Sequence, residues 1–126
     1  MEELQKKQLN LLEETVKFFN SENRCITQYG GCNYYLEGKD GCAIGRKIED
    51  KELCKELDKG LGPDLESGVD KILVFSRLPD NLKELGQKFL HRLQRLHDDQ
   101  ENWNYSGISP KGEDVVKDIK EIFNLN

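Results

Sequence analysis

The sequence predicts a mainly α-helical protein, at the margin of the α+β class, with about five helices around one core and a small β-hairpin near residues 25–36. Three observations support this prediction. Apolar residues recur every three or four positions through most of the chain, which places them on one face of a helix. One segment instead holds short β-prone runs bounded by glycines. The length of 126 residues, with no linker-like stretch, is typical of a single domain, which we expect to span residues 1–126.

The first predicted helix runs from about Glu2 to Asn20 and carries more apolar surface than one buried face requires. Its two adjacent stripes are formed by Leu9, Leu12, Val16 and Phe19, and by Leu4, Leu11 and Phe18. Together the stripes cover about half of the helix circumference. Either two layers of the same chain cover this helix, or the stripe of Leu4, Leu11 and Phe18 meets another chain, in a partner complex or a homodimer.

A different pattern follows the first helix. The β-prone runs 25–29 and 33–36 are separated by a glycine pair, which predicts the hairpin. Helical spacing then returns, and the small residues Ala43 and Gly45 would let another backbone approach closely. Asp50 is a suitable N-cap for a short helix, which the glycines and the proline that follow it would end.

Two longer helices are predicted in the second half of the chain. Residues 69–75 suit either a buried helical turn or a strand. A helix over 80–99 follows, and its apolar stripe comprises Leu82, Leu85, Phe89, Leu90, Leu93 and Leu96. After a loop that holds Trp103, Ser109 is the expected cap of a last helix, with Pro110 in its first turn.

The two histidines lie on the helix predicted for 80–99, but on different faces of it. His91 and His97 are six residues apart, which separates their side chains by roughly 120° around the helix. Two ligands for one metal ion need a spacing of three or four residues. We therefore expect His91 to point to solvent, and His97 to be a structural polar residue together with Asp98. Metal-dependent phosphohydrolases with a His-Asp dipeptide need further histidines on other helices, so we expect no enzymatic activity.

The four cysteines leave one metal-binding alternative open. Cys25, Cys32, Cys42 and Cys54 lack the close pairs, two to four residues apart, that usually hold structural zinc. The region is nevertheless short enough to gather all four. A zinc-stabilised interaction module is therefore the alternative to buried, inert thiols, and our first expectation is no cofactor.

Charge and hydropathy exclude two classes of partner. The formal net charge of −5 argues against general nucleic-acid binding, because phosphate neutralisation requires a basic surface. Lys88, Arg92 and Arg95 nevertheless form a local basic stripe on one side of a predicted helix. No run approaches the ~20 apolar residues that span a bilayer, and the first ten residues are too polar for a signal peptide. We expect a cytoplasmic protein with no membrane contact.

The chain from Arg24 to Phe123 carries an Arg-Cys start, a Cys-Ala-x-Gly centre, and a Leu-Gln-x-x-His-Asp stretch that leads to a tryptophan. The residues of this pattern are Arg24, Cys25, Cys42, Ala43, Gly45, Leu93, Gln94, His97, Asp98 and Trp103. The pattern resembles a group of small uncharacterised proteins from bacteriophages and prophages. The chain departs from it at Thr27, where the group has an aromatic residue, and at the extra Cys32 and Cys54. The resemblance implies a phage or prophage origin, and therefore action in the cytoplasm of a host bacterium.

These features lead to two main hypotheses of function. The first is a non-catalytic, phage-type accessory protein that binds a host bacterial protein and inhibits or modulates it, with Leu4, Leu11 and Phe18 as the contact stripe. The alternative is a binding protein for a small, nucleotide-like ligand. The residues offered for that second role are Arg24, Tyr34, Tyr35, Arg46 and Trp103.

Overall fold

The computed structural model describes residues 2–24, 34, 41–59 and 72–125. In these ranges the protein is mainly helical, with one two-stranded antiparallel sheet, which confirms the predicted fold class. The elements are α1 (Glu3–Phe18), the 3-10 helix η1 (Gly45–Lys47), α2 (Lys51–Lys59), α3 (Ile72–Phe75), α4 (Asp80–Lys83), α5 (Gln87–Asp98), the 3-10 helix η2 (Gln100–Asn102), β1 (Trp103–Asn104), β2 (Gly107–Ile108) and α6 (Pro110–Ile122).

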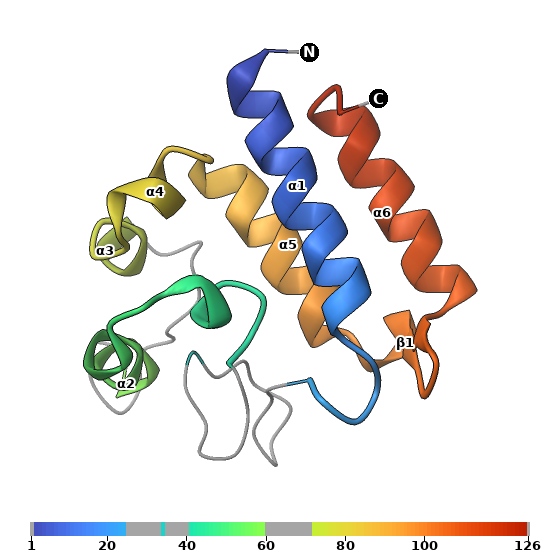
Figure 1. The fold of residues 1–126 in the computed structure, drawn as a ribbon, viewed down its shortest axis with the longest axis horizontal. Coiled ribbons are helices and arrows are strands. Elements are labelled where there is room, and N and C mark those ends of the chain that lie inside the picture. Colours follow the sequence, from blue (N-terminus) through green and yellow to red (C-terminus); the bar gives the residue numbers. More distant parts are fainter. Residues whose placement is uncertain (1, 25–33, 35–40, 60–71, 126) are drawn as a thin grey trace.

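The three longest helices, α1, α5 and α6, lie together on one side of the molecule (Figure 1). Helix α1 contacts α5 and β2, and α5 contacts α6. Helix α6 runs antiparallel to α1, so the two chain ends lie close to each other (Figure 1). At that end the Gln5 Nε2 atom donates to the carbonyl oxygen of Asn124 at 3.0 Å. Among the described residues, no helix combines the length and apolarity needed to cross a membrane.

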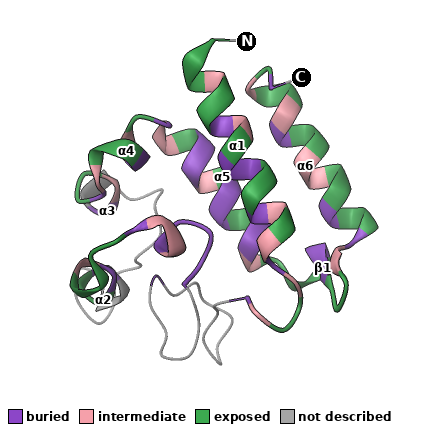
Figure 2. Cartoon of the chain, in the orientation of Figure 1, coloured by how far each residue is buried: buried purple, intermediate pink, exposed green. Residues whose placement is uncertain are grey.

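The core lies where the inner faces of these helices meet the η1 and α4 segments (Figure 2). Its largest fully buried side chains are Phe19, Leu12, Tyr34, Ile44, Ile48, Leu57, Leu82, Phe89, Leu90, Leu93, Leu96 and Ile119. The predicted apolar stripe of residues 80–99 is therefore buried as expected, including Leu82 and Leu85 before the start of α5. Burial of this apolar surface is the main term that stabilises the fold.

The structure does not present Leu4, Leu11 and Phe18 as one open stripe. Leu11 is only 5% exposed and packs in the protein's own core, whereas Leu4 is 43% exposed. Phe18 is half-buried, because its ring meets Phe19 edge-on at 4.8 Å and the Arg46 guanidinium lies 4.3 Å from its centroid. Because Leu11 is buried and Phe18 is partly covered, the three residues do not form a continuous contact surface for a partner.

The single helix predicted for 80–99 is wrong, since α4 and α5 are separate. Gly86 lies between them with a φ of 92°, a left-handed conformation that glycine adopts more easily than other residues. The apolar spacing continues across this break, so the sequence pattern does not reveal where one helix ends and the next begins. Asp50, in contrast, caps α2 as predicted, accepting from the backbone N–H groups of Glu52 and Leu53.

The described β-hairpin is not the predicted one. Residues 25–33 and 35–36 of the predicted hairpin lie outside the described residues. The observed pair is β1 with β2, in a segment expected to be a loop, where Trp103 pairs with Ile108 and Asn104 with Gly107. Strands of two residues are too short to show the alternation that identifies a strand in a sequence.

Two other expectations concern the middle of the chain. Residues 72–75 form the helical turn α3, whereas 69–71 lie outside the described residues. The close approach expected at Gly45 is confirmed, because a Cβ atom there would lie 2.6 Å from the Cα of Tyr34 and closer still to its carbonyl oxygen. Only glycine fits at this point of η1.

Candidate functional site

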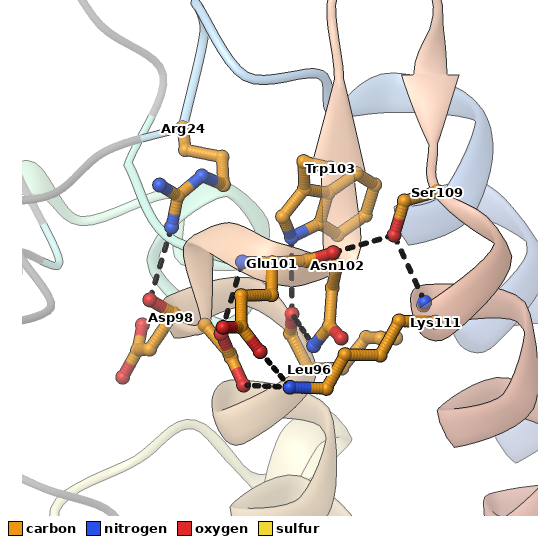
Figure 3. A network of polar contacts seen from close by, with 10 residues as sticks. Arg24, Leu96, Asp98, Glu101, Asn102, Trp103, Ser109 and Lys111 are labelled. Atoms are coloured by element: carbon orange, nitrogen blue, oxygen red, sulfur yellow. Dashed lines mark hydrogen bonds and ion pairs between the residues drawn. The ribbon is translucent and has the colours of Figure 1, made fainter.

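The C-terminal end of α5 is held by side chains from the segment that follows it (Figure 3). The carbonyl oxygen of Leu96 accepts from Asn102 Nδ2 and from the Trp103 indole Nε1, both at 3.0 Å. The carboxylate of Asp99 caps η2 by accepting from the Glu101 N–H at 3.0 Å. A helix leaves its last carbonyl groups without partners, and here the chain supplies them. These bonds fix η2 and β1 against the end of α5.

Arg24 holds the same helix end from another part of the chain (Figure 3). Its Nη1 atom donates to the carbonyl oxygens of His97 and Asp98, each at 3.0 Å, and the residue is only 7% exposed. Burial lowers the pKa of the Arg24 guanidinium, and the carboxylates of Asp98 and Asp99 act in the opposite direction. A cation at a helix C-terminus also interacts favourably with the helix dipole.

The start of α6 is tied to the same turn. Ser109 Oγ accepts from the Gly112 N–H at 3.1 Å and donates to the Glu101 carbonyl oxygen at 2.6 Å, which confirms Ser109 as the cap. The Ser109 N–H donates to the Asn102 carbonyl oxygen at 2.8 Å. Lys111 contacts the carboxylates of Glu101 and Asp99, and the hydrogen bond to Glu101 raises the pKa of Lys111. Asn102 is therefore fixed between α5 and α6.

The two histidines occupy different environments. His97 is fully buried, its Nδ1 atom lies 2.8 Å from Asp98 Oδ1, and its ring meets the ring of Phe19 at 4.7 Å. His91, expected to point to solvent, is half-buried, and its Nδ1 atom is buried without a hydrogen-bond partner among the described residues. The Trp103 indole binds Leu96 and not His97.

A cleft of about 380 Å³ lies beside this network, between the C-terminal half of α5 and α6. It is lined by Arg92, Arg95, Asp98, Asp99, Asn102, Val115, Asp118 and Ile119. Its volume is within the ~300–1,000 Å³ range of ligand clefts in proteins. Helix α5 contributes one charged wall, α6 contributes a wall with two apolar residues and Asp118, and Asn102 joins the two walls.

Several polar groups of this cleft have no partner within the described part of the chain. Arg92, Arg95 and Asp118 are exposed and form no ion pair with any described residue. Asn102 is 2% exposed, and its Oδ1 atom has no hydrogen-bond partner there either. The cleft therefore presents two arginines and the carboxylate of Asp118 without ion-pair partners among the described residues, beside the paired carboxylates of Asp98 and Asp99.

No family model, curated protein or solved structure matches this chain.

The residues predicted to bind a nucleotide-like ligand do not form an open site. Arg24, Tyr34 and Trp103 are buried and bind other parts of the protein, with Tyr34 Oη accepting from Gln94 Nε2 at 3.2 Å. Arg46 lies over Phe18, and Tyr35 is outside the described residues. Arg24, Tyr34, Arg46 and Trp103 do not line the α5–α6 cleft. These four side chains instead make contacts within the fold.

The structure describes two of the four cysteines of the zinc alternative. Cys42 and Cys54 are fully buried next to the backbone of Gly45, whereas Cys25 and Cys32 lie outside the described residues. Within the ranges that the structure describes, no three His, Cys, Asp or Glu side chains are placed to hold a metal ion. The carboxylates of the α5–α6 cleft therefore do not converge on one point.

Sequence reasoning found part of the cleft and missed the rest. The basic stripe of Lys88, Arg92 and Arg95 contains the two arginines that line it, while Lys88 lies outside the lining. Asp118 and Asn102 were missed. The signal for Asp118 was its place on the same face of the last helix as Val115, and nothing in the sequence indicated that Asn102 is buried.

Proposed function

We propose that this protein is a non-catalytic accessory protein that binds another protein through the α5–α6 cleft. The observation that carries this proposal is the set of charges without ion-pair partners among the described residues, Arg92, Arg95 and Asp118, around one cleft. Arginine is enriched at protein interfaces, and polar groups at the rim of an interface set its specificity.

The environment of the reactive side chains supports a non-catalytic role. His97, Cys42 and Cys54 are fully buried, and His97 is engaged by Asp98 and Phe19. A general base or nucleophile must come within hydrogen-bond reach of its substrate. These three residues are better suited to packing than to chemistry.

The phage-like pattern supports a bacterial protein as the partner, which the accessory protein would inhibit or modulate. Four residues of that pattern, Arg24, His97, Asp98 and Trp103, meet around the end of α5. Trp103 and Asn102 bind the same Leu96 carbonyl oxygen. The residues of the resemblance therefore form the frame that positions the floor of the cleft.

The test compares two substitutions on one helix. Arg95→Glu reverses a charge inside the cleft, and Lys88→Glu makes the same charge change on α5 outside it. Each variant and the wild type are immobilised, exposed to bacterial lysate, and the captured proteins are quantified by mass spectrometry. We expect Arg95→Glu to reduce capture of the partner about tenfold, equivalent to about 1.4 kcal/mol, and Lys88→Glu to leave it unchanged. Equal capture by all three proteins would contradict the proposal.

A further inference from the structure

We propose that two copies of this chain associate through a groove between α1 and α6, in which α6 of one copy lies antiparallel to α6 of the other. The groove is on a different face of α6 from the α5–α6 cleft. The inference therefore goes beyond the proposed function and does not depend on it.

An apolar surface is left partly uncovered between these helices. Helices α1 and α6 both contact α5, and a groove of about 400 Å³ lies between α1, β2 and α6 (Figure 1). Three of its lining residues are branched, apolar and half-buried, one each from α1, β2 and α6: Val16, Ile108 and Val116. A helix laid against them removes this surface from water, which is favourable.

The charged residues of the groove follow one line along α6. Glu113 lies in the first turn of the helix, Lys117 four residues later, and Lys120 in the last turn. Residues three or four apart share a helix face. None of these three side chains forms an ion pair with a described residue. The groove is therefore acidic at the end next to the hairpin and basic toward the C-terminus.

This order of charges is complementary to itself. A two-fold axis that crosses α6 between Val116 and Lys117, midway between Glu113 and Lys120, generates an antiparallel second helix. Glu113 of each copy then lies at the height of Lys120 of the other, and the two Val116 side chains lie near the axis. At about 1.5 Å per residue, Lys117 is offset from Glu113 of the second copy by only about 4.5 Å along the helix.

The same charges disfavour other arrangements. A parallel pairing would place Glu113 against Glu113 and Lys120 against Lys120, and like charges in contact are unfavourable. A uniformly acidic segment would meet Glu113, and a uniformly basic one would meet both lysines. The second copy instead offers an opposite charge at each end of the groove and an apolar residue at its centre.

The first experiment measures the oligomeric state of the full chain. Three partly exposed apolar residues from each copy are few for an obligate interface, so we expect a weak dimer with a Kd on the order of 100 µM. Sedimentation equilibrium at low salt, from about 10 µM to about 1 mM protein, measures this Kd. A monomer throughout this range would overturn the proposal and leave the groove to a different protein.

The second experiment uses a matched pair of charge reversals on adjacent residues. Glu113→Lys makes both two-fold-related pairs repulsive, and Asp114→Lys makes the same change on an exposed residue outside the groove. We expect Glu113→Lys to raise the dimer Kd about tenfold and Asp114→Lys to change it less than about twofold. Circular dichroism checks that both variants are folded. Equal effects of the two reversals would refute the pairing.

The third experiment restores the pairing with two different copies. Lys120→Glu should weaken self-association as Glu113→Lys does. In a mixture of the two variants, residues 113 and 120 of one copy again face opposite charges on the other. We expect native mass spectrometry to show a mixed dimer with a Kd within about threefold of the wild type. A mixture that associates no better than either variant alone would refute the antiparallel arrangement.

One variant separates this proposal from the proposed function. Arg95→Glu lies in the α5–α6 cleft and outside the groove, so we expect it to reduce partner capture and to leave the dimer Kd unchanged. A dimer that forms as expected while Arg95→Glu does not change capture would refute the proposed function alone. Reduced capture by Arg95→Glu from a protein that is monomeric would refute the dimer alone.

Discussion

The packing of Gly112 against the turn below the cleft can be tested by one added methyl group. Gly112 lies in the first turn of α6, where its N–H donates to Ser109 Oγ. A Cβ atom at this position would lie 2.6 Å from Ile108 Cγ1 and closer still to the carbonyl oxygen of Asn102. The Gly112→Ala substitution therefore forces the Asn102 turn or α6 to move by about 1 Å.

Helix propensity and packing predict opposite signs for this substitution. Alanine is favoured over glycine in a helix interior by up to about 1 kcal/mol. Overpacking costs about 1–3 kcal/mol, and strain on the hydrogen bond from Ser109 to the Asn102 carbonyl adds about 1 kcal/mol. The packing terms are larger. We therefore expect Gly112→Ala to lower the free energy of unfolding by about 2 kcal/mol and the Tm by roughly 5–10 °C.

Trp103 provides the measurement, because it is the single tryptophan of the chain, it is buried, and it packs at the same helix end. Urea unfolding followed by tryptophan fluorescence gives the free energy of unfolding from the midpoint and slope. Lys117→Ala on the exposed side of α6 is the control and is expected to change stability by less than about 0.5 kcal/mol. An unchanged or increased stability of Gly112→Ala would refute the close contact with Asn102.

The same assay tests two further features. Leu11→Ala should lower the free energy of unfolding by about 2–4 kcal/mol because Leu11 is buried. Leu4→Ala should change it by less than about 0.5 kcal/mol, because Leu4 is exposed. Equal effects of the two substitutions would show that Leu11 is as exposed as Leu4. Arg24→Met should lower it by about 1–3 kcal/mol, because two carbonyl groups at the end of α5 lose their donor. If Arg24→Met is as stable as the wild type, water replaces the Arg24 guanidinium as donor to these carbonyl groups without loss of free energy.

Local signals in the sequence were sufficient to predict most of the helices and the caps at which α2 and α6 begin. The apolar spacing of α5 and the cap at Ser109 depend on residues within a few positions of one another, so the chain itself carries the information. The break at Gly86 was missed because apolar side chains before and after it reach the same core. A glycine inside an apolar repeat is compatible with a continuous helix and with a turn, and only tertiary packing decides between them.

The roles of polar residues depend on contacts between segments that are distant in the sequence, and such contacts cannot be predicted from a local pattern. Arg24 was offered as a ligand-binding group, yet it donates to the end of a helix more than seventy residues away. Phe18 was offered as a partner contact, yet Arg46 covers its ring. In both cases the residue type was suited to binding, and the nearest acceptor or ring belonged to the protein itself.

The α5–α6 cleft shows the opposite: residues not expected to take part in binding lie together in the structure. Its unpaired charges come from two helices separated by a hairpin, and Asn102 lies on the short 3-10 helix between them. A buried asparagine differs from a surface asparagine only in its surroundings, so the sequence did not indicate it. The signal in the sequence was the arginine stripe, and the structure adds Asp118 from the other helix of the cleft. The proposed binding of another protein depends on this combination of charges from both helices, rather than on any one residue.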